Sequence, residues 1–347
     1  MRRKLMILFS LIFFLAIPVN SMEISAPTVP ESGAQLMPKE PESFGEGLLW
    51  VANNAMKRFQ PEFIEAAKMC IQVLCAVLLT SVAAQFPVKN QGILRLVNTL
   101  SIGIILFGPA NSLIALGSNT VRDLSEYGKL LLPVMTTAMA AQGGITTASA
   151  LYTGTAFFNA FLTAIISSVI VPLLYVYLCL CIIGNLLEGG SLAQLKGFVK
   201  WVMTWLLKIV LYVFTGYLSI TGVVSGTADA SAVKAAKLTI SGVVPVVGGI
   251  LSDASEAVLV STGILKNAAG IYGVLALLSV WIGPFLKIGI RYLLLKFTAS
   301  VCDIFGEKKD VSLVHDFSGG MGMLAGMTGT VCLLHLISTV CFMKGIG

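Results

Sequence analysis

The chain has 347 residues, of which 56% are hydrophobic and only 12% are charged, and its mean hydropathy is +0.89. A soluble domain carries about 25% charged residues, so this composition excludes an ordinary soluble protein and indicates an integral membrane protein. The formal net charge of +6 favours basic loop anchors over nucleic-acid binding, which usually needs a clustered basic face.

Residues 1–21 are typical of a secretory signal peptide. Basic residues at positions 2–4 precede an apolar run, and Ser21 offers a short residue at a cleavage site ahead of Met22. An uncleaved anchor is the alternative. In either case the chain from Met22 onward is expected to begin outside the cytoplasm.

Residues 22–65 form a polar, proline-punctuated extracytoplasmic N-terminal region, acidic and tail-like in its first part. The pattern of residues 45–65 predicts a short amphipathic helix. This helix would either lie at the membrane interface or pack loosely on the surface.

Residues 66–129 are predicted to form a first transmembrane hairpin and an outer loop. The two spans cover about 67–86 and 96–116, and the polar segment Asn119–Lys129 is expected to be an external loop. Lys89 lies in the turn between the spans. Positive charge there places the turn in the cytoplasm, which agrees with an exported N-terminus.

Residues 130–152 have the length of a membrane span but low hydrophobicity, and Pro133, Gly143 and Gly144 interrupt them. We expect two half-helices or one kinked span. The apolar run 157–187 predicts a long kinked or tilted helix around Pro172, and the span at about 202–224 returns outward.

Residues 225–241 are predicted to form an amphipathic helix on the outer membrane surface that carries Lys234 and Lys237. An apolar segment follows that is too broken for an ordinary span and too apolar for an exposed loop. Its candidate gating or structural residues are Pro245, Gly248, Gly249, Asp253, Lys266 and Asn267.

Two further apolar segments, 268–285 and 286–305, precede a polar loop at 306–316 and a last span at about 321–342. Lys287 and Arg291 are four residues apart and share a helix face, which we expect to point to cytoplasm, lipid headgroups or a wet cavity. Gly322 and Gly326 form a GxxxG pattern, which predicts close helix packing within or between protomers.

The prolines suggest an internal repeat. Pro133 and Pro172 are separated by 39 positions, as are Pro245 and Pro284. Residues 130–224 and 242–347 would then be two related membrane bundles whose Gly/Pro-broken segments meet near the midplane, as in transporter folds. Chance alignment of apolar sequence is the alternative.

No sequence pattern for catalysis, a cofactor or a metal is found. The chain has no HExxH, P-loop or GxSxG motif, and its seven cysteines form no CxxC pair. Most cysteines lie in apolar runs and are interpreted as small core residues. We expect no enzyme activity, no cofactor, no metal and no nucleic-acid partner.

A family resemblance rests on polar residues spaced through apolar sequence. The stretch from Gly226 to Gly270 contains KAAK at 234–237, PVVG at 245–248 and LKN at 265–267. This pattern resembles stage III sporulation protein AE of endospore-forming bacteria, over roughly residues 66–343. The N-terminal region 22–65 is short for that family, so its role stays open.

The resemblance implies a mother-cell membrane protein that faces the forespore. It would join other membrane proteins of its sporulation operon and a forespore membrane partner in a channel or secretion-like complex across the intermembrane space. The fold expected is all-α and polytopic, with about 6–8 membrane segments. A stand-alone secondary transporter is the alternative function, and homo-oligomer formation is left open.

Overall fold

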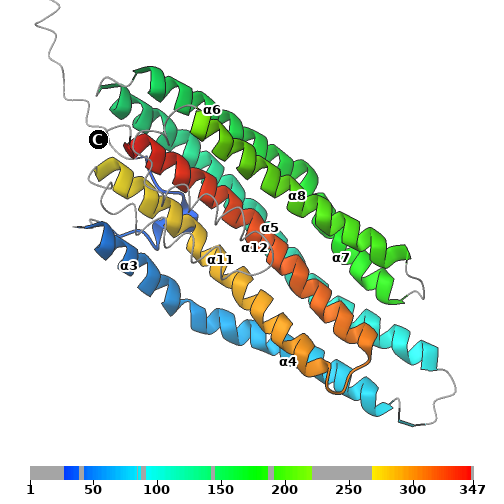
Figure 1. The fold of residues 1–347 in the computed structure, drawn as a ribbon. Coiled ribbons are helices and arrows are strands. Elements are labelled where there is room, and N and C mark those ends of the chain that lie inside the picture. The colour runs from blue at the N-terminus through cyan, green and yellow to red at the C-terminus, as the bar shows by residue number, and fades with distance from the viewer. Residues whose placement is uncertain are drawn as a thin grey trace, which may run out of the picture.

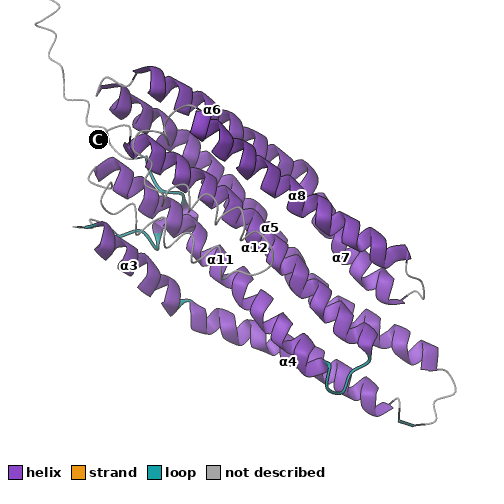
Figure 2. Ribbon diagram, in the orientation of Figure 1, coloured by secondary structure: helices purple, strands orange, loops and turns teal. Residues whose placement is uncertain are grey.

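The computed structural model of the chain describes residues 27–38, 43–83, 85–86, 91–141, 145–186, 191–220 and 268–344. These residues form helices joined by short connections, and none of these ranges contains a strand (Figure 2). The predicted all-α fold is confirmed. The elements in chain order are α2 (Glu31–Ala34), α3 (Phe44–Lys57), α4 (Phe59–Ala83), α5 (Gln91–Ala141), α6 (Ile145–Ile165), the π-helix η1 (Ile166–Ile170), α7 (Val171–Leu186), α8 (Ser191–Ile220), α11 (Ala268–Cys302) and α12 (Lys308–Lys344).

Six helical segments of the described residues are long and apolar enough to cross a membrane, which agrees with the predicted polytopic architecture. They are Phe44–Ala83, Gly92–Met139, Ala148–Leu186, Leu192–Ser219, Gly270–Cys302 and Lys308–Met343.

The helices run side by side in an elongated bundle (Figure 1). At its lower right end the chain reverses three times, between α4 and α5, α7 and α8, and α11 and α12. We call this the loop end. At the opposite end α8 finishes and α11 begins, and α5 is followed by α6.

Helix α12 is the centre of the bundle. Its apolar stretch is 83% buried and that of α11 is 72% buried, whereas the other four segments reach at most 39%. It packs against α5, α6, α7, α8 and α11. Its contacts with α5 recur on one face, since Gly117 meets Leu324 and Gly128 meets His335. Both steps are eleven residues, close to three helical turns, so the two helices lie parallel and in register.

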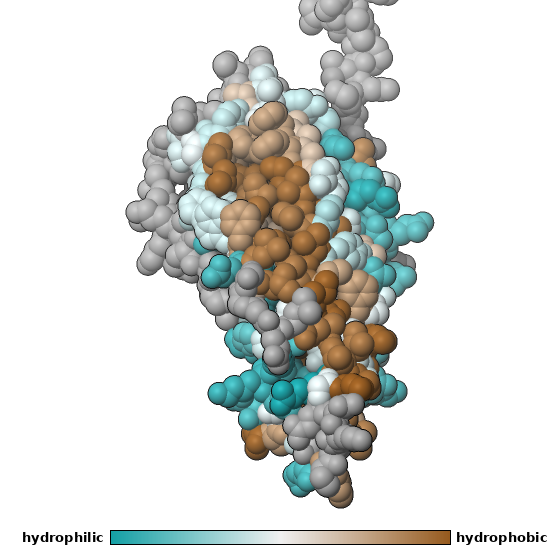
Figure 3. Space-filling model, turned by 90° about the vertical axis from the view of Figure 1, so that its right-hand side faces the viewer, coloured by the Kyte–Doolittle hydropathy of each residue, from teal (hydrophilic) through white to brown (hydrophobic). Residues whose placement is uncertain are grey.

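The outer surface of the bundle is apolar over much of its length, as lipid contact requires. On α8 a buried inner stripe faces the other helices, and the exposed side carries Phe198, Trp201, Trp205 and Ile209. Figure 3 shows a continuous hydrophobic region on one side of the molecule, bordered by hydrophilic residues along its right flank and toward the lower end. Five of the cysteines are buried as expected, but Cys75 and Cys179 are exposed on the periphery.

The prediction of an external loop at Asn119–Lys129 is wrong, because this segment lies inside the 51-residue helix α5. Its charged residues Arg122, Glu126 and Lys129 lie on the exposed side of the helix, where Arg122 and Glu126 form an i,i+4 ion pair at 3.9 Å. Val121, Leu124 and Tyr127 are buried on the opposite side. The segment is therefore an amphipathic stretch of helix rather than a turn.

The segment 130–152 is neither a single kinked span nor a pair of half-helices. It contains the end of α5 and the start of α6, two long helices that pack antiparallel, as the hydrogen bond from Asn159 Nδ2 to the Ser125 carbonyl shows. The apolar run 268–285 was predicted to continue through 286–305. The two segments form one helix, α11, with Pro284 inside it.

The long helix predicted around Pro172 is present as α6, η1 and α7 in direct succession. The π-helix ends where Val171 N–H donates to the carbonyl of Ile166, five residues back. Pro172 has no N–H and clashes with the preceding turn of a regular α-helix. A short π segment just before it is a common way for a helix to absorb such a defect.

Candidate functional site

Few of the residues singled out from the sequence are described in the structure. Pro133 lies inside α5 and Gly322 and Gly326 lie in α12. The other candidates lie outside the described residues, as do the signal peptide and the surface helix 225–241: Gly143, Gly144, Lys234, Lys237, Pro245, Gly248, Gly249, Asp253, Lys266 and Asn267. The internal repeat, which depends on Pro245, therefore stays a prediction.

The two glycines of the GxxxG pattern have different surroundings. A Cβ at Gly322 would lie 3.1 Å from the Tyr292 ring of α11, so this glycine allows close packing within the chain. A Cβ at Gly326 would meet nothing within 4 Å. Among the described residues, Gly326 therefore has no neighbour on its side of α12.

Two ion pairs join α11 to α4. Lys287 Nζ lies 3.0 Å from Glu62 Oε1, and Arg291 lies 2.5 Å from Glu65 Oε1. The sequence predicted that this basic face points to cytoplasm, lipid headgroups or a wet cavity, and the structure pairs it with the acidic face of α4. The acidic residues are three apart on α4 and the basic residues four apart on α11, which places each set on one helix face.

Arg291 is the most deeply buried member of this group. Its side chain is 5% exposed, whereas that of Glu65 is 63% exposed. Arg291 Nε and Glu62 Oε2 are buried without a hydrogen-bond partner among the described residues, and the other contact of the guanidinium is the Met69 sulfur at 3.7 Å. A buried cation needs its partner, so these pairs fix the register of α4 on α11.

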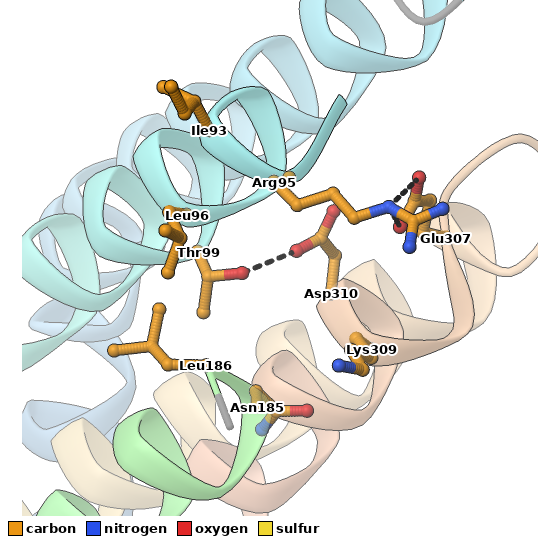
Figure 4. Close-up of a pocket in the computed structure, with 10 residues that line it drawn as sticks. Ile93, Arg95, Leu96, Thr99, Asn185, Leu186, Glu307, Lys309 and Asp310 are labelled. Atoms are coloured by element: carbon orange, nitrogen blue, oxygen red, sulfur yellow. Dashed lines mark hydrogen bonds and ion pairs between the residues drawn. The ribbon is translucent and has the colours of Figure 1, made fainter. Parts of the chain in front are cut away.

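A cavity of about 420 Å³ opens at the loop end, where the start of α5, the end of α7 and the start of α12 meet (Figure 4). Apolar side chains line one part of it and charged or polar side chains the other. The lining residues are Gly92, Ile93, Arg95, Leu96, Thr99, Asn185, Leu186, Glu307, Lys309 and Asp310.

Asp310 is the buried charge of this cavity, with 5% exposure. Its carboxylate accepts hydrogen bonds from Asn98 Nδ2 at 2.6 Å and from Thr99 Oγ1 at 3.4 Å, and both of these α5 residues are buried. The ion pair of Arg95 with Glu307, at 3.1 Å, lies nearer the solvent. Figure 4 shows the contact of Thr99 with Asp310 and that of Arg95 with Glu307, which connect α5 to the start of α12.

A second polar contact near the loop end holds α12 against α7 and α8. Lys196 of α8 pairs with Asp316 of α12, and Ser312 Oγ donates to the same carboxylate at 3.5 Å. Tyr177 of α7 donates its hydroxyl to the carbonyl oxygen of Asp316 at 3.1 Å. Sequence reasoning missed the pairs between helices, because their members are more than one hundred positions apart.

These groups can hold helices together and can bind a polar or charged group in the cavity. In the ranges that the structure describes, no three His, Cys, Asp or Glu side chains lie together in a way that could hold a metal ion. The polar residues instead bridge helices that are distant in sequence, which is the usual role of polar side chains inside a membrane bundle.

A bundle of membrane-length helices with an apolar exterior and polar contacts between its helices defines a polytopic helical membrane protein. Its sequence from residue 46 to residue 345 matches the model of the stage III sporulation protein AE family. The chain belongs to this family, and the resemblance found in its sequence is confirmed.

One curated relative is the stage III sporulation protein AE of Bacillus subtilis (strain 168). It is 21% identical over 221 residues, which cover 64% of this chain and 55% of the relative. The chain therefore spans about half the length of the curated relative it matches. No solved structure matches the chain.

Proposed function

We propose that the protein is a non-enzymatic, multi-span subunit of a channel or secretion-like complex between mother cell and forespore, needed for endospore formation. The observation that carries this proposal is the family match, which runs over nearly the whole described bundle. The family is one of sporulation proteins, and a membrane-embedded bundle suits a scaffold or export component better than a soluble factor.

The structure supports a scaffold in a specific way. Its interhelical ion pairs and hydrogen bonds tie α4 to α11, α5 to α12, and α8 to α12. Polar contacts inside a membrane bundle are costly to leave unmade, so they favour one arrangement of the helices. A scaffold subunit needs such a fixed arrangement of its helices, because it positions the neighbouring subunits of the complex.

The location follows from the same proposal. The protein would lie in the mother-cell membrane that faces the forespore, with its mature N-terminus outside the cytoplasm. Its partners would be other membrane proteins of the same sporulation operon and a forespore membrane protein across the intermembrane space. The loop end would then face the mother-cell cytoplasm, because the first reversal of the chain after an external N-terminus lies there.

Affinity purification of the tagged chain from sporulating cells tests this function. Other sporulation membrane proteins should be recovered with it in a fixed ratio, and deletion of the gene should arrest forespore development. Normal spores from the deletion strain would contradict the proposal. Solute uptake by the purified chain alone in vesicles would instead support a stand-alone transporter.

A further inference from the structure

Among the residues that the structure describes, one side of the central helix α12 is only partly covered, between two neighbouring helices. α8 and α11 both pack against α12, but in the described ranges they do not form a packed interface with each other. Figure 1 shows α12 lying between them. The α12 residues on this side are mostly glycine and are half-buried rather than buried: Gly319, Gly322, Met323 and Gly326.

Lysines stand on both sides of this partly covered surface. Lys200 of α8 reaches α12, since its Nζ would be 3.7 Å from a Cβ at Gly319. On α11, the Lys296 ammonium lies 5.8 Å from the centre of the Tyr292 ring, and that ring covers Gly322. Both lysines are exposed. The two cations therefore flank the same stretch of α12.

These lysines have no carboxylate partner in the described part of the chain. The carboxylate facing this side of α12 is Asp316, and Lys196 already pairs with it. His315 is exposed beside it. The local charge is therefore about two positive units with histidine neutral, which is complementary to an anion.

The position of the lysines along the bundle matches the depth of lipid headgroups. Lys200 lies nine residues after the start of α8, or about 14 Å from the loop end at 1.5 Å per residue. The exposed ring of Trp201 follows directly, and tryptophan is enriched at membrane interfaces. From there Gly322 and Gly326 continue α12 deeper into the bundle.

We propose that this surface binds an anionic phospholipid. Its phosphate would lie between Lys200 and Lys296, and one acyl chain would lie along Gly326, where no described residue comes within 4 Å of a Cβ. Basic pockets between membrane helices on the cytoplasmic side are known to take anionic headgroups. A partner helix would also fit the glycines, but it would leave the two cations unneutralised unless it carried acids at that depth.

The full chain, purified in a neutral detergent, provides the test. Phosphatidylglycerol should raise its thermal unfolding temperature more than phosphatidylcholine of the same acyl composition. The double variant Lys200→Gln, Lys296→Gln should bind phosphatidylglycerol roughly 25-fold more weakly, because each lysine near an anionic lipid contributes about a fivefold factor. The matched control Lys57→Gln, Lys129→Gln removes the same charge from exposed sites elsewhere and should bind as the parent does.

A second variant tests the acyl chain separately. A Cβ at Gly326 would contact no described residue, so the Gly326→Leu variant without lipid should unfold at the same temperature as the parent. Phosphatidylglycerol should no longer raise the unfolding temperature of this variant. Unchanged lipid binding in the double lysine variant would overturn the proposal, and so would equal stabilisation of the parent chain by inorganic phosphate. A third contrary result would be a Gly326→Leu variant that still binds phosphatidylglycerol but no longer co-purifies with a sporulation membrane protein. The last result would assign the surface to a protein partner.

Discussion

The ring of His335 on α12 lies directly over Gly128 on α5, so that a Cβ at Gly128 would stand 2.1 Å from His335 Cε1. His335 is only 2% exposed and has no room to turn away. Gly128→Ala should therefore lower the free energy of unfolding by about 1–3 kcal/mol, the usual range for overpacking. Thermal unfolding of the purified chain in detergent measures this.

A matched control lies in the same helix. A Cβ at Gly108 meets nothing within 4 Å, so Gly108→Ala should gain up to about 1 kcal/mol of helix propensity. Adding His335→Ala to Gly128→Ala should recover part of the lost free energy of unfolding, because the ring that the new Cβ would clash with is removed. Equal free energies of unfolding for Gly128→Ala and Gly108→Ala would contradict the close contact between Gly128 and His335.

The Arg291–Glu65 pair predicts an asymmetric response to mutation. Glu65→Ala leaves a buried guanidinium without its carboxylate, whereas Arg291→Met leaves an exposed carboxylate and an apolar side chain in the interior. Glu65→Ala should therefore be the more destabilising change, by about 1–3 kcal/mol. Chemical or thermal unfolding of both variants checks the order, and the reverse order would show that Arg291 is not the buried partner.

The cavity at the loop end offers an internal comparison between a buried and an exposed contact. Asp310→Ala removes the acceptor of two buried donors, Asn98 and Thr99, and should cost about 1–3 kcal/mol. Arg95→Ala breaks the half-exposed pair with Glu307 and should cost at most about 1 kcal/mol. Asp310→Asn should fall between them. Similar losses for Asp310→Ala and Arg95→Ala would mean that Asp310 is not the anchor of α12.

The orientation of the bundle can be tested by thiol labelling in a background where the exposed Cys75 and Cys179 are replaced by alanine. Ile304→Cys lies in the loop between α11 and α12 at 81% exposure, and we expect it to react from the cytoplasmic side. Lys234→Cys is expected to react with an impermeant reagent from outside. Labelling of both from one side would overturn the proposed topology.

The sequence predicted the class of fold because hydropathy reports directly on membrane helices. It also predicted that one helix ends and the next begins between α4 and α5 and between α7 and α8, since prolines, glycines and charges cluster in the sequence there. It failed at 119–129, where a charged segment was interpreted as a loop. Val121, Leu124 and Tyr127 recur at helical spacing and carried the signal that the segment is a helix with one buried side.

Contacts between distant helices were beyond the reach of a single sequence. The spacing of Glu62 and Glu65 matches that of Lys287 and Arg291 when both sets are placed on helices, but nothing in the sequence says that α4 and α11 are neighbours. The cavity around Asp310 depends on three chain segments that meet only in the folded bundle. Hydropathy predicts which segments enter the membrane and leaves their partners undetermined.

The central position of α12 has a consequence for synthesis. A ribosome makes this helix after every helix that it contacts, so α5, α7 and α8 enter the membrane while Asn98, Tyr177 and Lys196 still lack the groups they bind. Until α12 arrives, these polar side chains must remain hydrated or be shielded by other proteins. Insertion of the bundle should therefore depend on a membrane chaperone or insertase that holds the early helices apart. The helices should then pack together in one late step, when α12 enters the membrane.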